Sequence, residues 1–76
     1  MLNADLELDA RGLNCPLPIL RTRKSMNTLQ TGQILKVIAT DPGSLKDLEA
    51  FCQQTGHEML ASSLENGEYH FNIRKG

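Results

Sequence analysis

The sequence has little of what marks several common classes of small protein. Only two of its 76 residues are cysteines, too few for the disulfide framework of a small secreted domain. Its apolar runs are far shorter than the roughly 20 residues that cross a bilayer, so no membrane partner is expected. The acidic start, MLNADLELD, lacks the apolar core of a signal peptide. We therefore expect one cytoplasmic domain over residues 1–76, with free thiols.

Excess positive charge and aromatic rings are also missing. The formal net charge is -1 at pH 7 and the sequence pI is about 6.0. One tyrosine, two phenylalanines and no tryptophan leave few rings on which nucleic-acid bases could stack. Because nucleic-acid-binding domains are usually strongly basic, no direct nucleic-acid partner is expected.

The first half of the chain predicts a strand, a helix and a second strand. Leu6 and Leu8 alternate with acidic residues, which is typical of a short strand with one apolar face. Residues 16–29 carry apolar side chains at helical spacing, and Gly32 is expected to end that helix. Residues 33–39 form a mostly apolar, β-branched run that indicates a central strand.

The second half predicts another helix and a hairpin. Ser44 is the expected N-cap, with Asp47 as a weak capping-box partner, and Gly56 is the expected C-terminal stop. The apolar stripe of this helix is formed by Leu45, Leu48, Cys52 and Thr55, with Phe51 beside it. Residues 58–65 and 68–74 read as strands, and Asn-Gly between them is the strongest short hairpin signal.

The element order is therefore βαβαββ. Both helices have one apolar stripe, and the simplest way to bury the two stripes is against one face of a single sheet. This predicts an α/β (α+β) two-layer sandwich, with a four-stranded mixed sheet and two helices on one face.

The stretch GLNCPLPIL, residues 12–20, places a cysteine where a helix is expected to begin. Pro16 fits the first helical position, and the residue before a proline favours the extended backbone of an N-cap. Pro18 disfavours a helical Leu17, so the helix could begin at Pro16 or at Pro18, with Cys15 at its tip in either case. Cys15 would then meet the positive end of the helix dipole, with the N–H groups of Leu17 and Ile19 facing its sulfur.

Charge near Cys15 in the sequence points the same way. Four cations and no acid lie between residues 11 and 24: Arg11, Arg21, Arg23 and Lys24. Helix ends and nearby cations lower the pKa of a thiol, so Cys15 is predicted to be an exposed, acidic, reactive cysteine. Cys52 lies on the apolar stripe of the second helix and is predicted to be a core residue.

Several cysteine chemistries are disfavoured. A thioredoxin-like disulfide needs Cys-x-x-Cys, but Pro18 stands three residues after Cys15. A hydrolase needs a histidine base, and His57 and His70 stand at strand positions without a local signature. The same histidines with Cys15 and Cys52 lack zinc-ligand spacing, so neither metal nor cofactor is expected. A lone nucleophilic sulfur that accepts and releases a group, for example as a persulfide, is left.

LDARGLNCPLPIL resembles the signature of the TusA-like, also called SirA-like, sulfur-carrier family, which is marked by Cys-Pro-x-Pro. The resemblance continues through TGQILKVIATDPGSLKDLEAFCQQTGHE, residues 31–58, and through the C-terminal YHFNIRKG. It implies a two-layer sandwich with sheet order 1-2-4-3 and strand four antiparallel to the rest.

The family carries sulfur as a cysteine persulfide, and the resemblance assigns that role to Cys15. Asp9, Gly12, Pro16 and Pro18 belong to the same motif and would shape the loop. The implied partners are a cysteine desulfurase or rhodanese-type donor and a downstream acceptor, with the free carrier a monomer. The implied activity is that of a sulfurtransferase-type carrier rather than a stand-alone catalyst.

Family branches serve tRNA wobble-uridine 2-thiolation, sulfur oxidation or other sulfur delivery. The tRNA branch has Glu between the two prolines, whereas Leu17 stands here, which points away from that branch but not from sulfur carriage. Arg11, Arg21, Arg23 and Lys24 would meet acidic partner surfaces, although such a charge run is commonly a solvated face. The competing hypothesis is a small regulatory or RNA-interacting module, in which Cys15 would be dispensable.

Overall fold

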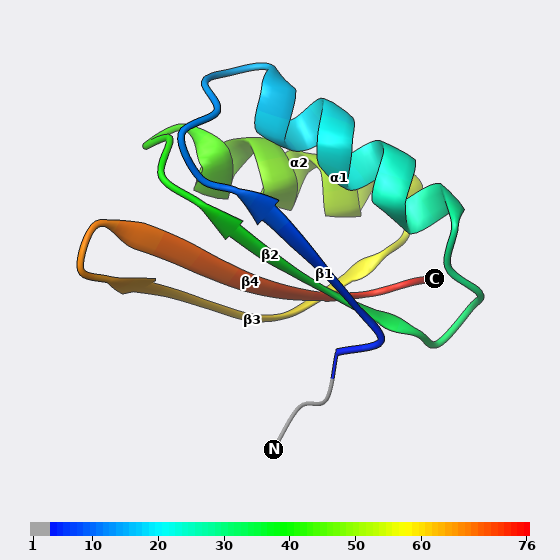
Figure 1. Ribbon diagram of the computed structural model, residues 1–76. Coiled ribbons are helices and arrows are strands. Elements are labelled where there is room, and N and C mark those ends of the chain that lie inside the picture. Colours follow the sequence, from blue (N-terminus) through cyan, green and yellow to red (C-terminus); the bar gives the residue numbers. More distant parts are fainter. Residues whose placement is uncertain (1–3) are drawn as a thin grey trace.

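Two layers make up the fold, a four-stranded sheet and a pair of helices that cover one of its faces (Figure 1). The computed structural model describes residues 4–76. The elements are β1 (Leu6–Ala10), α1 (Leu17–Asn27), β2 (Ile34–Ala39), α2 (Ser44–Thr55), β3 (Glu58–Glu65) and β4 (Glu68–Arg74). The predicted α+β sandwich with element order βαβαββ is confirmed.

The strands lie in the order β1-β2-β4-β3, which leaves β1 and β3 as the two edges of the sheet. Strands β1 and β2 are parallel, and β4 runs antiparallel to both β2 and β3. The order and the direction of strand four are those that the family resemblance implied. Because β1 and β2 are parallel neighbours, the loops that follow them meet at one end of the sheet (Figure 1).

The core lies between the central strands and the two helices. Leu35 and Val37 of β2 and Phe71 and Ile73 of β4 are fully buried. The helices close this layer from one side with Met26 from α1 and Leu48, Phe51 and Cys52 from α2. The apolar faces of the strands and of the helices therefore pack in one shared core.

Local signals located the second half of the chain well. The strands β3 and β4 have the predicted bounds, and Asn66 and Gly67 between them both have positive φ, at 51° and 78°. Two positive φ values are the geometry of the tight hairpin turn that Asn-Gly favours. Gly56 is left-handed, with φ 80°, and its N–H donates to the Cys52 carbonyl 3.0 Å away at the end of α2.

The predicted end of the first helix is wrong. Helix α1 ends at Asn27, because the N–H groups of Thr28 and Leu29 bond three residues back, to Ser25 and Met26, and so close the last turn. Gly32, with φ 92°, instead shapes the turn into β2.

The N-cap of the second helix lies one residue before the predicted one. Gly43 is the N-cap, and Ser44 is the first helical residue, 1% exposed with no hydrogen-bond partner for its hydroxyl. Thr55, which was assigned to the apolar stripe, is exposed, and its hydroxyl donates to the Phe51 carbonyl.

Candidate functional site

Cys15 lies in the loop between β1 and α1 and is exposed. This loop leaves the carboxyl end of β1, beside the loop that leaves β2 (Figure 1). The two loops are joined directly, because the N–H of Gly12 donates to Thr40 Oγ1 at 2.9 Å. Gly12 has φ 79°, a left-handed conformation that suits glycine at this bend.

Arg11 fixes the other side of the loop. Its Nε donates to Asp9 Oδ1 at 2.9 Å and its Nη2 to Asp9 Oδ2 at 3.0 Å. Its Nη1 reaches Glu68 at the start of β4, 3.2 Å away. These hydrogen bonds from Arg11 lower the pKa of Asp9 to about 2. Asp9 therefore holds the side chain of Arg11 at the start of this loop. Its loop-shaping role stays a prediction.

The start of α1 differs from the prediction. Pro16, not Cys15, is the N-cap, and the helix begins at Leu17. The N–H of Leu17 is already used, because it donates to the carbonyl of Asn14 at 2.8 Å. Pro18 is buried, and its carbonyl accepts the hydroxyl of Thr22 at 2.8 Å. The sulfur thus lies one residue before the N-cap, and one N–H that was expected to face it is taken.

The predicted lowering of the Cys15 pKa is wrong. Partial desolvation raises the pKa of the Cys15 thiol, and the carboxylates of Asp47 and Asp41 raise it further. Both carboxylates converge on Gly43 at the start of α2: a Cβ on that residue would lie 3.3 Å from Asp41 Oδ2 and 3.9 Å from Asp47 Oδ2. An anion on Cys15 would face two negative charges, so the neutral thiol is favoured.

These acids were missed because only neighbours in sequence were counted. Asp41 follows β2 and Asp47 lies one turn into α2, so both are far from Cys15 along the chain. Parallel pairing of the first two strands carries both loops to the same end of the sheet. The predicted topology therefore contained the signal that places Asp41 beside the thiol.

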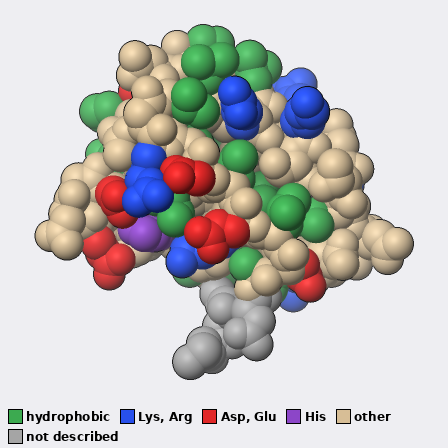
Figure 2. Space-filling view, viewed as in Figure 1, with side chains coloured by type: hydrophobic (Ala, Val, Ile, Leu, Met, Phe, Trp, Pro, Cys, Tyr) green, Lys and Arg blue, Asp and Glu red, His purple; other side chains and the backbone are tan. Residues whose placement is uncertain are grey.

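The four predicted docking cations do not form one patch. Arg11 is held by Asp9 and Glu68, and the Arg23 guanidinium lies 5.7 Å from the ring centroid of Phe51. Only Arg21 and Lys24 lie together, along a groove between α1 and β1. In Figure 2 Lys and Arg side chains stand beside apolar side chains on this face, apart from a mixed cluster of acids and bases.

Cys52 and the two histidines, for which the sequence disfavoured a chemical role, lie in separate places. Cys52 is 5% exposed in the core, and burial raises the pKa of its thiol. The Nδ1 of His57 accepts the N–H of Gly76, and the Nε2 of His70 lies 3.4 Å from Glu68. Within residues 4–76, no three His, Cys, Asp or Glu side chains are grouped so that they could hold a metal. Over the same residues no helix is long and apolar enough to cross a membrane.

In comparisons with known proteins, a family model and individual relatives agree with one another. The family model described as Sulfurtransferase TusA matches residues 6–75. The sulfur carrier protein TusA of Allochromatium vinosum is 59% identical over 75 residues, which are 99% of each chain. The putative sulfur carrier protein YrkI of Bacillus subtilis is 48% identical over 75 residues, 99% of this chain and 100% of its own.

A solved structure agrees in three dimensions. The crystal structure of the SirA-like protein from Desulfitobacterium hafniense superposes with a TM-score of 0.83 at 25% sequence identity, covering 93% of this chain and 97% of the other. The fold, the order of its strands and the extent of the sequence match therefore lead to one conclusion: the chain belongs to the TusA family.

Proposed function

We propose that the protein is a sulfur carrier that accepts sulfane sulfur as a persulfide on Cys15 and passes it to a downstream acceptor. The observation that carries this proposal is the contrast between its two thiols. Cys15 is exposed at the tip of α1, where a partner's sulfur can reach it, whereas Cys52 is enclosed in the core. The relatives named as sulfur carriers support the same role.

The transfer is an exchange between sulfur atoms with no net oxidation. The Cys15 thiolate attacks the outer sulfur of a persulfide on the donor protein, and a new S–S bond forms on Cys15. The donor's own S–S bond breaks and its cysteine leaves as a thiolate. Delivery repeats this step in the other direction, with the acceptor's nucleophile attacking the outer sulfur on Cys15.

The surroundings of Cys15 suggest how the thiolate is made available. In the free protein Asp47 and Asp41 favour the neutral thiol, which limits reaction with unrelated electrophiles. A partner that brings a cation against these carboxylates would cancel their charge and favour the thiolate at the moment of docking. The carrier would then be activated by its partner rather than by its own helix.

The donor in this proposal is a cysteine desulfurase or a rhodanese-type protein in the cytoplasm. The acceptor belongs to a relay for tRNA wobble-uridine 2-thiolation, for sulfur oxidation or for other sulfur delivery. Leu17, between the two prolines, favours delivery outside tRNA thiolation. Restored 2-thiouridine in a bacterial strain that lacks its own carrier would identify the tRNA relay as the acceptor.

Sulfur loading read by mass tests the proposal. The protein is incubated with a cysteine desulfurase and cysteine, or with a rhodanese and thiosulfate, and its intact mass is measured with and without reductant. We expect the wild type to gain sulfur that reductant removes. Cys15→Ser should gain none, because the accepting atom is absent.

Cys52→Ala is the matched control and should load like the wild type. Loading that persists in Cys15→Ser would contradict the assignment of the accepting sulfur. Absence of loading in the wild type with both donors would favour the regulatory-module hypothesis instead.

A further inference from the structure

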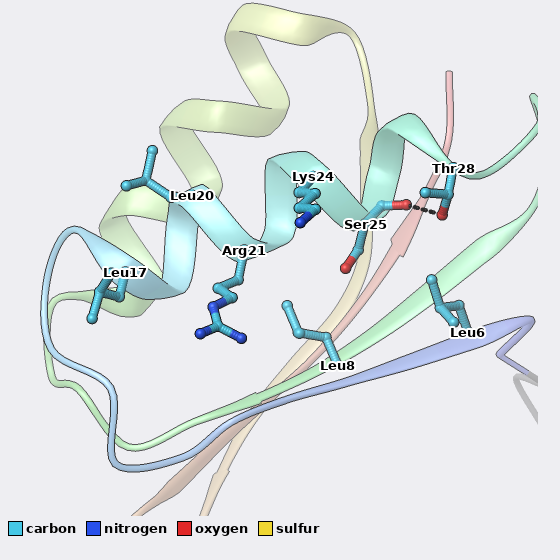
Figure 3. A pocket seen from close by; sticks show the side chains of 8 residues that line it. All are labelled: Leu6, Leu8, Leu17, Leu20, Arg21, Lys24, Ser25 and Thr28. Carbon is cyan, nitrogen blue, oxygen red and sulfur yellow. Dashed lines mark hydrogen bonds between the residues drawn. The ribbon is translucent and has the colours of Figure 1, made fainter.

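An apolar groove runs between α1 and the edge strand β1, beside the loop that carries Cys15 (Figure 3). Its volume is about 730 Å³. Its apolar lining consists of Leu6, Leu8, Leu17 and Leu20. Leu6 is 37% exposed, Leu17 43% and Leu20 52%, although leucine is a residue that folding normally hides. Side chains from the strand and from the helix thus face a shared space that the described chain does not fill.

The strand beside this groove has a free edge. Within residues 4–76, β1 pairs with β2 and has no strand on its other side. The N–H of Lys75 donates to the Gln33 carbonyl, so in β2 the backbone groups of Leu35 and Val37 point to β4. Leu6 and Leu8 are their parallel partners, so the backbone groups of these leucines point the same way, into β2. The N–H and C=O groups of Glu7 and Asp9 therefore point to the open edge, where an added strand could bond to them.

The charges at the groove have one sign. Arg21 and Lys24 line it, and none of its lining residues is acidic. Within the described residues, the ion pairs involve Arg11, His70 and Arg74, so neither Arg21 nor Lys24 is neutralised by the protein itself. In Figure 3 the Arg21 side chain reaches from α1 into the space above β1.

The groove also leads to the sulfur. Leu17 lines it and is the first residue of α1, two positions after Cys15. A segment lying in the groove along β1 would therefore hold its parent protein next to the thiol.

We propose that this groove binds an extended, acidic and apolar segment of the protein that exchanges sulfur with Cys15, which adds as a strand to the free edge of β1. Main-chain bonds to Glu7 and Asp9 supply affinity. On the side of the segment that faces α1, the leucines of the groove contact apolar side chains, and Arg21 and Lys24 select acidic ones. The proposal rests on the proposed function, since it names the surface by which a sulfur partner docks.

The probe is a synthetic peptide of eight residues in which every second position, the side turned to α1, holds leucine and aspartate in turn, with threonine at the other positions. It is titrated into isotope-labelled protein and followed by NMR. The same peptide with lysine in place of aspartate is its control. We expect the acidic peptide to shift the amide signals of β1 and α1, and the basic peptide to bind at least about 5-fold more weakly.

Matched variants assign the binding to the groove. Leu20→Ser should weaken binding of the acidic peptide at least about 5-fold. Leu64→Ser should not, because Leu64, which is 60% exposed, lies on the opposite edge strand β3. Arg21→Gln should weaken this binding about 2- to 5-fold, and Arg23→Gln, on the same helix but outside the groove lining, should leave it unchanged.

Strand addition itself is tested at Glu7. Glu7→Pro removes an N–H that points away from β2 and is tolerated at such an edge position. Its amide spectrum confirms that it remains folded, and Glu7→Ala controls for the lost side chain. Weaker binding in Glu7→Pro than in Glu7→Ala is expected.

Two results would overturn the proposal: acidic-peptide shifts on β3 or nowhere, and a wild-type dimer in sedimentation that Leu20→Ser dissociates. The second would assign the groove to another copy of this chain. Sulfur loading by inorganic polysulfide, which needs no partner, is measured in parallel. Leu20→Ser should load like the wild type, and a wild type that does not load would contradict the proposed function, separately from the groove.

Discussion

The two cysteines of this protein have the same side chain in opposite situations. Cys15 lies on an exposed loop where two neighbouring parallel strands end, and Cys52 is 5% exposed on the inner face of α2. Burial alone raises the pKa of Cys52. The pKa of Cys15 is raised by partial desolvation and also by Asp47 and Asp41. Changing the charges around the thiol can thus shift the pKa of Cys15, whereas only opening of the core can shift the pKa of Cys52.

The largest effect that this comparison predicts is in the rate of alkylation. In native protein at pH 8, iodoacetamide should modify Cys15, measured in Cys52→Ala, at least about 100-fold faster than Cys52, measured in Cys15→Ser. The reagent reaches Cys52 only through openings of the core, whose cost approaches the global stability of about 5–15 kcal/mol. Mass spectrometry over time gives both rates.

Similar alkylation rates for the two thiols would contradict the difference in their accessibility. The control is the same pair of variants in 6 M guanidinium chloride, where the difference should disappear because neither thiol is protected.

A smaller effect is predicted for the pH dependence of Cys15. Because its pKa is raised, less thiolate is present at neutral pH than for an ordinary thiol, and the alkylation rate should climb with pH through the raised pKa. Asp47→Asn, in the Cys52→Ala background, removes one of the charges that raise this pKa. The increase of the alkylation rate with pH should then occur at lower pH, and the alkylation rate at pH 7 should rise several-fold.

Glu49→Gln is the matched control, because Glu49 lies on the same helix and does not act on the Cys15 pKa. An unchanged rate profile in Asp47→Asn would mean that its carboxylate does not reach the thiol. An equal shift in Glu49→Gln would point to the overall charge of α2 instead.

The smallest effect concerns stability. Cys52→Ala trims a packed side chain and should lower the free energy of unfolding by about 1 kcal/mol. Cys15→Ser changes an exposed side chain and should stay within about 0.5 kcal/mol of the wild type. Urea unfolding followed by circular dichroism measures both, and a larger loss in Cys15→Ser would show that its loop supports the fold.

The parts of the fold that could be predicted depend on local chemistry. The Asn66-Gly67 turn needs two positive φ values, and the strands on either side of it follow from their alternation, so the hairpin was located to the residue. Met26, Leu48 and Phe51 were on the predicted apolar faces and are buried. The exposure of Cys15 followed from a polar loop between a strand and a proline.

What could not be predicted depends on which distant groups meet. The charge environment of Cys15 was inferred from cations near it in sequence, but Arg11 is neutralised by Asp9 and Glu68, and Arg23 lies over Phe51. The acids that act on the thiol come from the next loop and helix. The sequence pattern also gave no sign that α1 and β1 leave a groove between them, since Leu6 lies on the apolar face predicted for its strand.

The hydrogen bond from Gly12 to Thr40 has a consequence for motion. It ties the loop that carries the sulfur to the loop that carries Asp41, so displacement of either loop would strain this bond. Under the proposed function, a partner that displaces one loop would therefore act on the other as well, and the sulfur and the carboxylate would respond together.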